Sequence, residues 1–165
     1  MNEVKNINKE FNHLKIHTQY SICEGALRTA DLGKYCKINH VKAAALCDTN
    51  NLCGALEFSE TLSKSKTQPI IGSQINIQYK EHNGKIPFFA KNLKGYKNLI
   101  KLSSKSFLDI KEGEEPHCKF DDLLDNHEGL IILTGSLDGF FGKLFSKNLT
   151  EKASILIENL KKTYK

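Results

Sequence analysis

Short apolar runs alternate along the chain with stretches in which apolar residues recur every three or four positions. Residues 11–17 alternate apolar and polar positions, with Leu14 and Ile16 on one face, which is typical of a half-buried strand. Near-continuous apolar runs predict further strands at residues 43–47, 69–79, 86–90 and 130–135. Helical spacing predicts helices at residues 30–38, 55–64 and 94–107, and a last helix that opens at Thr150 and Glu151.

Polar and glycine-containing segments mark the ends of these elements. We expect Thr29 as the N-cap of the first helix, a polar turn at residues 48–54 and a loop at residues 111–117. The run HNG at residues 82–84 favours a tight hairpin. The resulting order, β-α-β-α-β-β-α-β-α, predicts an α/β fold with a mostly parallel sheet, open or rolled into a barrel. A closed barrel of this kind typically needs about 200 residues or more, so we expect a barrel that stops before it closes.

The composition is that of one globular domain of 165 residues, with 39% hydrophobic and 26% charged residues. No apolar run reaches the length of a membrane-spanning helix, and the polar first ten residues lack the apolar core of a secretion signal. We therefore expect a cytoplasmic protein without a membrane partner. Residues 1–10 are expected to form an N-terminal extension, and residues 11–165 the folded domain.

The cysteine spacing and the charge distribution argue against several classes of protein. The five cysteines favour neither a disulfide framework nor a zinc ribbon, because none stands in a C-x-x-C pair. Cys47 closes an apolar strand and is favoured as a small core residue rather than as a redox partner of Cys53. The net charge of +5 is spread along the chain, and Arg28 is the only arginine. Nucleic-acid binders usually carry a basic stripe rich in arginine, so the charge does not favour direct DNA binding.

Polar side chains that could carry chemistry cluster where the predicted strands end, as functional residues do in parallel α/β proteins. His17, Glu24 and Asp48 are metal ligands by type, and they are the residues expected to hold a metal if one binds. Lys15, Thr49 and Gln74 lie at equivalent places but are poor ligands, because lysine is cationic and the other two offer neutral oxygens. His13 alternates with Lys15, so it either lines the same cavity or serves as a hydrogen-bonded structural residue.

The remaining histidines, aromatic pairs and glycines are expected in ordinary structural roles. The phenylalanine pairs at residues 88–89 and 140–141 are assigned to the core rather than to a platform for bases. No glycine pattern of a nucleotide-binding loop is present. Exposed positions in loops or turns are expected for His40, His82, His117 and His127.

Five ordered segments carry a resemblance to a known family. They read HLKIHTQYSICEG, AAALCDTNNLCGALEF, PIIGSQINI, AKNLKGYKNLIKL and EGLIILTGSLDG, and they span the chain from about Phe11 to its end. In this order they resemble the N-terminal polymerase-and-histidinol-phosphatase (PHP) domain of bacterial replicative DNA polymerase III alpha subunits. The pattern AKN-x-x-GY-x-NL-x-x-L points to the polymerases rather than to stand-alone phosphatases of the same fold.

The resemblance places the family's metal-site pattern on the polar residues at the strand ends. Its second and third histidines fall on Lys15 and His17, and its acid before glycine falls on Glu24. Its histidine after the aspartate, which is Asp48 here, falls on Thr49, and its strand glutamate falls on Gln74. Because Lys15, Thr49 and Gln74 are no longer ligands, the chain is similar to a branch in which the metal site is degenerate, and no bound metal is expected.

The resemblance implies a distorted barrel of seven β/α units, of which this chain would supply an incomplete part. It also implies a scaffold within the alpha subunit, which docks a proofreading exonuclease subunit and meets DNA only through the holoenzyme. Template-directed synthesis with Mg²⁺ would belong to a later domain, because no paired D-x-D aspartates occur in this chain. Two alternatives remain open: a PHP-type metal-dependent phosphoesterase or exonuclease, and a stand-alone, non-catalytic binding module.

Two hypotheses accompany this interpretation. The ammonium group of Lys15 is expected to take the place of metal charge and to neutralise Glu24 and Asp48. A barrel that stops before closure would leave an unpaired strand edge, so the isolated chain is expected to be marginally stable or to aggregate.

Overall fold

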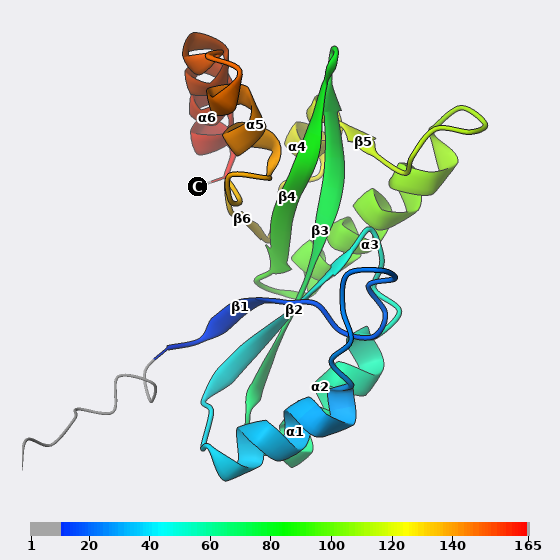
Figure 1. Ribbon diagram of the computed structural model, residues 1–165, viewed down its shortest axis with the longest axis vertical. Helices are drawn as coiled ribbons and strands as arrows, with labels where there is room; N and C mark the ends of the chain where they lie inside the picture. Colours follow the sequence, from blue (N-terminus) through cyan, green and yellow to red (C-terminus); the bar gives the residue numbers. More distant parts are fainter. Residues whose placement is uncertain (1–10, 165) are drawn as a thin grey trace, which may run out of the picture.

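The structure is a computed structural model that describes residues 11–164; the expected N-terminal extension at residues 1–10 lies outside the described residues. One sheet forms the centre of the molecule, with helices packed along it (Figure 1). Its strands are β1 (His13–Ile16), β2 (Ala43–Thr49), β3 (Gln68–Tyr79), β4 (His82–Ala90), β5 (Cys118–Lys119) and β6 (Leu130–Ile132). The helices are α1 (Thr29–Ile38), α2 (Ala55–Lys64), α3 (Leu93–Leu108), α4 (Phe120–Asp125), α5 (Phe140–Ser146) and α6 (Thr150–Thr163).

The strand order explains how the chain turns from a parallel to an antiparallel arrangement. The main path of the sheet runs β1-β2-β3-β4-β6, and β5 pairs with β3 off this path. β1, β2 and β3 are parallel, whereas β4 pairs antiparallel with both β3 and β6. The expected α/β fold is confirmed. The described residues form an open sheet, in which β1 and β6 are the two ends of the main path.

The β3–β4 hairpin is confirmed, but the predicted position of its turn is wrong. Tyr79 pairs directly with His82, so the connecting residues are Lys80 and Glu81, and Lys80 takes the left-handed conformation with φ 54°. The Asn-Gly pair expected to form the turn lies inside β4 instead. With the turn at 80–81, Ile75 pairs directly with Ile86, and both side chains are completely buried, so packing across the two strands favours this register.

Other predicted boundaries shift by a few residues. Arg28 is the N-cap of α1, and Thr29 is its first residue, whose hydroxyl hydrogen-bonds Glu57 on α2 instead of capping the helix. The residues expected to begin a polar turn, Asp48 and Thr49, extend β2 because the ladder with β3 continues through them. The last predicted strand ends at Ile132 rather than at residue 135.

Three short elements were not predicted from the sequence: β5, α4 and α5. α5 contains the pair Phe140-Phe141, which the sequence assigns to the core but to no element, and both side chains are buried. β5 has two residues, and its Cys118 pairs with Ile77 of β3. Elements this short show less than two turns or two pleats of periodicity, so the apolar pattern cannot distinguish them from loops.

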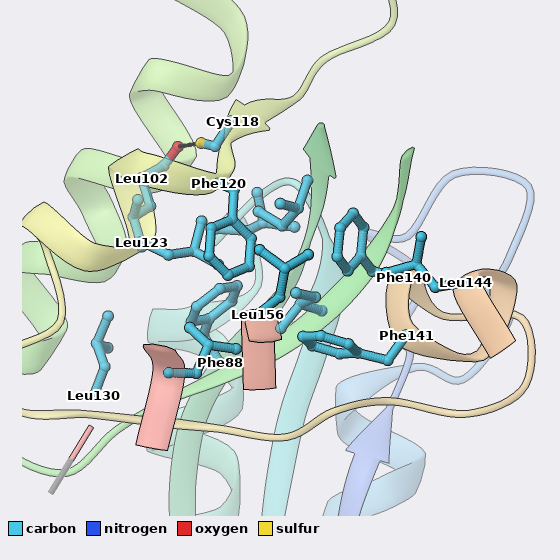
Figure 2. Packing of buried hydrophobic residues seen from close by; sticks show 14 of the residues in the cluster. Phe88, Leu102, Cys118, Phe120, Leu123, Leu130, Phe140, Phe141, Leu144 and Leu156 are labelled. Atoms are coloured by element: carbon cyan, nitrogen blue, oxygen red, sulfur yellow. Dashed lines mark hydrogen bonds between the residues drawn. The ribbon is translucent and has the colours of Figure 1, made fainter. Parts of the chain in front are cut away.

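The main core lies between the β3–β4 hairpin and helices α3, α4, α5 and α6 (Figure 2). Phe88 and the pair at residues 140–141 are almost completely buried there, which confirms that the phenylalanine pairs belong to the core. Cys118 donates to the carbonyl of Leu102 across this core at 3.1 Å (Figure 2). A second cluster around Phe58 fills the space between β2, α1 and α2.

The exposure of the four histidines expected in loops or turns differs from the prediction. His40 is exposed, but His117 and His127 are half-buried and His82 is buried at the start of β4, so the expectation of four exposed histidines is wrong for three of them. Lys152 of α6 lies 3.0 Å from Nε2 of His82, which explains the burial: the imidazole joins the last helix to the hairpin. Within residues 11–164, no helix is long and apolar enough to cross a membrane.

The cysteines divide into two classes with different expected reactivity. Cys36, Cys47 and Cys118 are buried, and burial raises the pKa of Cys47 and of Cys118 to about 12. Because the thiolate is the reactive form, only the exposed Cys23 and Cys53 should react quickly with a thiol reagent at neutral pH. We expect two fast thiols in the native protein and five in denaturant. Rapid modification of all five in the native protein would contradict the packing of β2 and β5.

Candidate functional site

A pocket of about 320 Å³ opens beside the ends of the parallel strands. It is lined by residues from β1, β3 and β4, from the loop after β1 and from the loop after β6. Four of the predicted site residues meet there, and Lys85 joins them from β4. The lining is Lys15, His17, Glu24, Gln74, Lys85, Pro87, Gly135, Ser136, Asp138 and Gly139.

Asp48 lies close to this pocket in the sheet but serves as an internal anchor. Its side chain is 0% exposed. One carboxylate oxygen accepts hydrogen bonds from the backbone N–H of Thr18 at 2.6 Å and from the hydroxyl of Ser21 at 3.0 Å. The other accepts from the Thr18 hydroxyl at 2.7 Å. Both oxygens therefore hold the loop after β1 against the end of β2 through hydrogen bonds.

Thr49, Gln74 and Glu24 form a connected polar chain on the pocket wall. The register of β2 and β3 pairs Thr49 directly with Gln74, and the Gln74 amide donates to the Thr49 hydroxyl at 2.8 Å. The Thr49 hydroxyl in turn donates to Glu24, and the Gln74 amide also reaches this carboxylate at 3.4 Å. Thr49 and Gln74 therefore both hydrogen-bond to the Glu24 carboxylate.

Lys85 completes this arrangement by forming an ion pair with Glu24. The two charged side chains are about one third exposed, at 35% for the lysine and 30% for the glutamate. Burial opposes ionisation of Glu24, but hydrogen bonds from Lys85 and Thr49 outweigh it, and the pKa of the carboxyl is lowered. Glu24 is therefore held as a carboxylate whose two oxygens are already bound by this chain.

His17 could act as a metal ligand, and one of its ring nitrogens has no hydrogen-bond partner among the described residues. Its Nδ1 atom is buried without a hydrogen bond among the described residues, and so is Oε1 of Gln74. Burial lowers the pKa of His17, and the positive charges of Lys15 and Lys85 act in the same direction against Glu24 and Asp48. The imidazole is thus favoured in its neutral form.

The hypothesis for Lys15 needs correction. Lys15 lines the pocket, but its side chain makes no ion pair within residues 11–164, and the lysine that neutralises Glu24 is Lys85. At Asp48, no lysine is needed, because the N–H and hydroxyl groups of Thr18 donate hydrogen bonds to its carboxylate. His13 is exposed and stacks edge-on against Phe11 with ring centroids 4.8 Å apart, so it does not line the pocket.

The sequence reasoning missed Lys85, Thr18, Ser21 and the loop at residues 135–139. Lys85 belongs to an antiparallel strand that is not part of the parallel strand-end pattern, so that pattern could not find it. A second, larger hollow of about 650 Å³ shares Lys85 and Asp138 with the pocket and continues toward His117. The pocket and this larger hollow are therefore neighbours along the β3–β4 hairpin.

The donor side chains around the pocket do not form a complete metal-binding set among the described residues. Within residues 11–164, no group of three or more His, Cys, Asp or Glu side chains is arranged to hold a metal ion. The oxygens of Asp48 and Glu24 are occupied by hydrogen bonds and an ion pair from this chain. A divalent ion would have to break the pair between Lys85 and Glu24 before it could gain a second ligand beside His17.

The ion pair predicts how the stability depends on pH. The pKa of Glu24 is lower in the folded chain than its ordinary value of 4.5, so its contribution is present above about pH 4.5. It is lost as the pH falls below 4.5 toward the lowered pKa. In a Lys85→Met variant, we expect the free energy of unfolding to decrease less steeply below pH 4.5 than it does in the wild type. Urea titrations at a series of pH values measure this, and identical slopes in both proteins would contradict the pairing.

An α/β sheet with a histidine and carboxylates near the ends of its parallel strands is the organisation that the resemblance to PHP domains implies. The chain belongs to the PHP domain family, whose model matches residues 13–165. The resemblance inferred from the five segments is confirmed.

The curated relatives specify the kind of protein. The chain is 35% identical to the DNA polymerase III subunit alpha of Caulobacter vibrioides, over 93% of this chain and 14% of that protein. It is 38% identical to the protein of the same name from Rickettsia prowazekii, over 92% of this chain and 13% of that protein. The chain thus spans about one seventh of the length of these relatives and corresponds to their PHP region.

One solved structure with a similar arrangement is an amidohydrolase from Chromobacterium violaceum. The superposition has a TM-score of 0.48 and 16% sequence identity, and it covers 58% of this chain and 32% of that chain.

Proposed function

We propose that this chain is the PHP part of a replicative DNA polymerase III alpha subunit and that it acts as a scaffold without metal chemistry. The observation that carries the proposal is the occupation of Glu24 by this chain's own groups. Lys85 and Thr49 bind its carboxylate, and Gln74 supports Thr49. An internal ammonium group offsets the carboxylate charge, so the site can remain folded without a divalent ion.

The proposed scaffold works within a larger assembly. Its partners are the remainder of an alpha subunit and a proofreading exonuclease subunit, and it meets DNA through that assembly, in the cytoplasm. The chain alone is proposed to be inactive in DNA synthesis. The names of its relatives support the alpha-subunit context. Size-exclusion chromatography of the chain mixed with the exonuclease subunit tests the docking, and separate elution of the two at micromolar concentration would contradict it.

Metal titration tests the proposed loss of the metal site. We expect no uptake of Zn²⁺ or Mn²⁺ by the wild-type chain in isothermal titration calorimetry. A triple variant, Lys15→His with Thr49→His and Gln74→Glu, replaces three non-ligands near the pocket with metal ligands. It should bind Zn²⁺ at least about tenfold more tightly than the weakest binding that the titration detects. Adding Lys85→Met frees Glu24 and should tighten binding further.

A matched control separates the site from the general effect of added ligands. The variant Lys37→His with Thr163→His and Gln68→Glu makes the same replacements at scattered positions outside the pocket and should not bind Zn²⁺. No uptake by the pocket variant would show that the geometry differs from the one described. Uptake of one Zn²⁺ by the wild-type chain, with hydrolysis of a phosphate ester, would replace the proposal with a PHP-type phosphoesterase.

A further inference from the structure

Helix α3 presents a second feature that the PHP site does not explain. Its inner face is buried against the sheet through Leu99 and Leu102, with Gly95 and Asn98 at its beginning. The Asn98 amide donates to the carbonyl of Glu128 at 2.8 Å, and Asn92 caps the helix. These contacts account for most of the pattern AKN-x-x-GY-x-NL-x-x-L, but they leave its outward side unexplained.

A row of large apolar side chains runs along the outward side of α3. Leu93, Ile100 and Phe107 are exposed at 69%, 42% and 52%. They are spaced seven residues apart, so they lie in one line along the helix, and the half-buried Tyr96 continues the row on the same side. We call these four residues the α3 stripe. It is about 21 Å long, from 14 residues at about 1.5 Å each, which matches the contact length of a packed helix.

The charge beside the α3 stripe has one sign. The helix carries four lysines and no acidic residue. Lys94 and Lys105 have acidic partners elsewhere in the fold. Lys97 and Lys101, which flank the stripe, form no ion pair within residues 11–164. A complementary surface would offer carboxylates to these two lysines.

We propose that the α3 stripe is a docking site for an amphipathic helix of a partner protein, with apolar residues at heptad spacing and carboxylates along one flank. Heptad spacing on α3 suits side-by-side helix packing, in which the apolar residues of one helix enter the gaps of the other. The partner's carboxylates would pair with Lys97 and Lys101 and fix its direction along the stripe. This inference is independent of the metal site.

Other occupants fit these observations less well. Two copies of the chain pairing through α3 would bring eight lysines and no carboxylate together, from four on each helix. A membrane surface would have to bury Ser104 and Lys97, which also project outward. DNA would pair with the lysines but would leave the three large apolar side chains without a partner.

A synthetic peptide of about three heptads tests the proposal, with leucine at the two apolar positions and glutamate at the flanking positions. We expect the 165-residue chain to bind it in fluorescence anisotropy. Lys97→Glu with Lys101→Glu should weaken binding roughly tenfold or more and should create binding to a matched peptide with lysine in place of glutamate. Ile100→Ser with Phe107→Ser should also weaken binding at least about tenfold.

Control variants keep the outcome interpretable. Lys34→Glu with Lys161→Glu changes the net charge equally at positions outside α3, and Leu137→Ser removes an exposed leucine elsewhere; neither should change binding. The lysine changes are at exposed positions, and circular dichroism verifies that all variants are folded. Equal binding of both peptides to wild type, insensitivity to the α3 variants, or α3-dependent association with anionic vesicles, with duplex DNA or with a second copy would each overturn the proposal.

Discussion

Replacing Asp48 with alanine is expected to lower the free energy of unfolding by about 3–5 kcal/mol. The substitution leaves three donors without their acceptor in a buried site: the N–H and hydroxyl of Thr18 and the hydroxyl of Ser21. Ser21 also accepts from the backbone N–H of Thr49, so the disturbance reaches the pocket wall. The effect is large because water cannot reach a carboxylate site that is 0% exposed to replace the lost bonds.

Urea denaturation of the wild type and two variants measures this effect. Asp48→Asn keeps the volume and one acceptor oxygen, so it should cost less than Asp48→Ala. Asp31→Ala removes an exposed carboxylate that makes only a 3.5 Å contact with Lys34, and it should change stability by less than about 0.5 kcal/mol. If Asp48→Ala and Asp31→Ala have similar effects, Asp48 does not anchor the loop after β1.

The large elements could be predicted because each has a complete apolar period. α2 begins and ends where its spacing predicts, at residues 55 and 64, and β3 differs by one residue. The hairpin turn could not be placed in the same way. Its local preference for Asn83-Gly84 is weaker than the packing of Ile86 against Ile75, which belongs to a core completed by helices that follow later in the chain.

The sequence predicts which residues lie at the candidate site, but it does not predict which of their side chains bind one another. Four of the residues expected at the strand ends line one pocket, because parallel strands bring their ends to one edge. Thr49 joins them through its hydroxyl, whereas Asp48 points its carboxylate at the loop after β1. Sequence spacing cannot predict which lysine pairs with Glu24, because Lys15 and Lys85 reach the same pocket from strands with opposite directions.

The polar side chains around Glu24 form one connected network. Thr49, Gln74 and Lys85 come from three different strands, yet each interaction supports the next and ends at Glu24. Changing a single member of this set leaves the groups that it contacts without that partner. The proposed loss of the metal site therefore predicts that several substitutions are needed together before the pocket binds a metal ion.

Gly95→Ala is expected to destabilise the chain by about 3 kcal/mol or more, although alanine favours a helix by about 1 kcal/mol over glycine. A Cβ atom at this position would overlap the backbone carbonyl of Gly129. That carbonyl accepts a hydrogen bond from the N–H of Lys91 at 2.9 Å, so the segment before β6 cannot move away without losing it. α3 would have to separate from the end of the sheet, which exposes part of the main core around Leu99.

Thermal and urea unfolding of Gly95→Ala and Ser104→Ala tests this close approach, because both add an alanine to the same helix. Ser104 is exposed, so its substitution should leave stability unchanged or raise it by a few tenths of a kcal/mol. A Gly95→Ala protein as stable as Ser104→Ala would show that α3 and Gly129 are not in contact. The expected difference instead assigns the glycine of the AKN-x-x-GY pattern to packing between a helix and a strand connection rather than to the pocket.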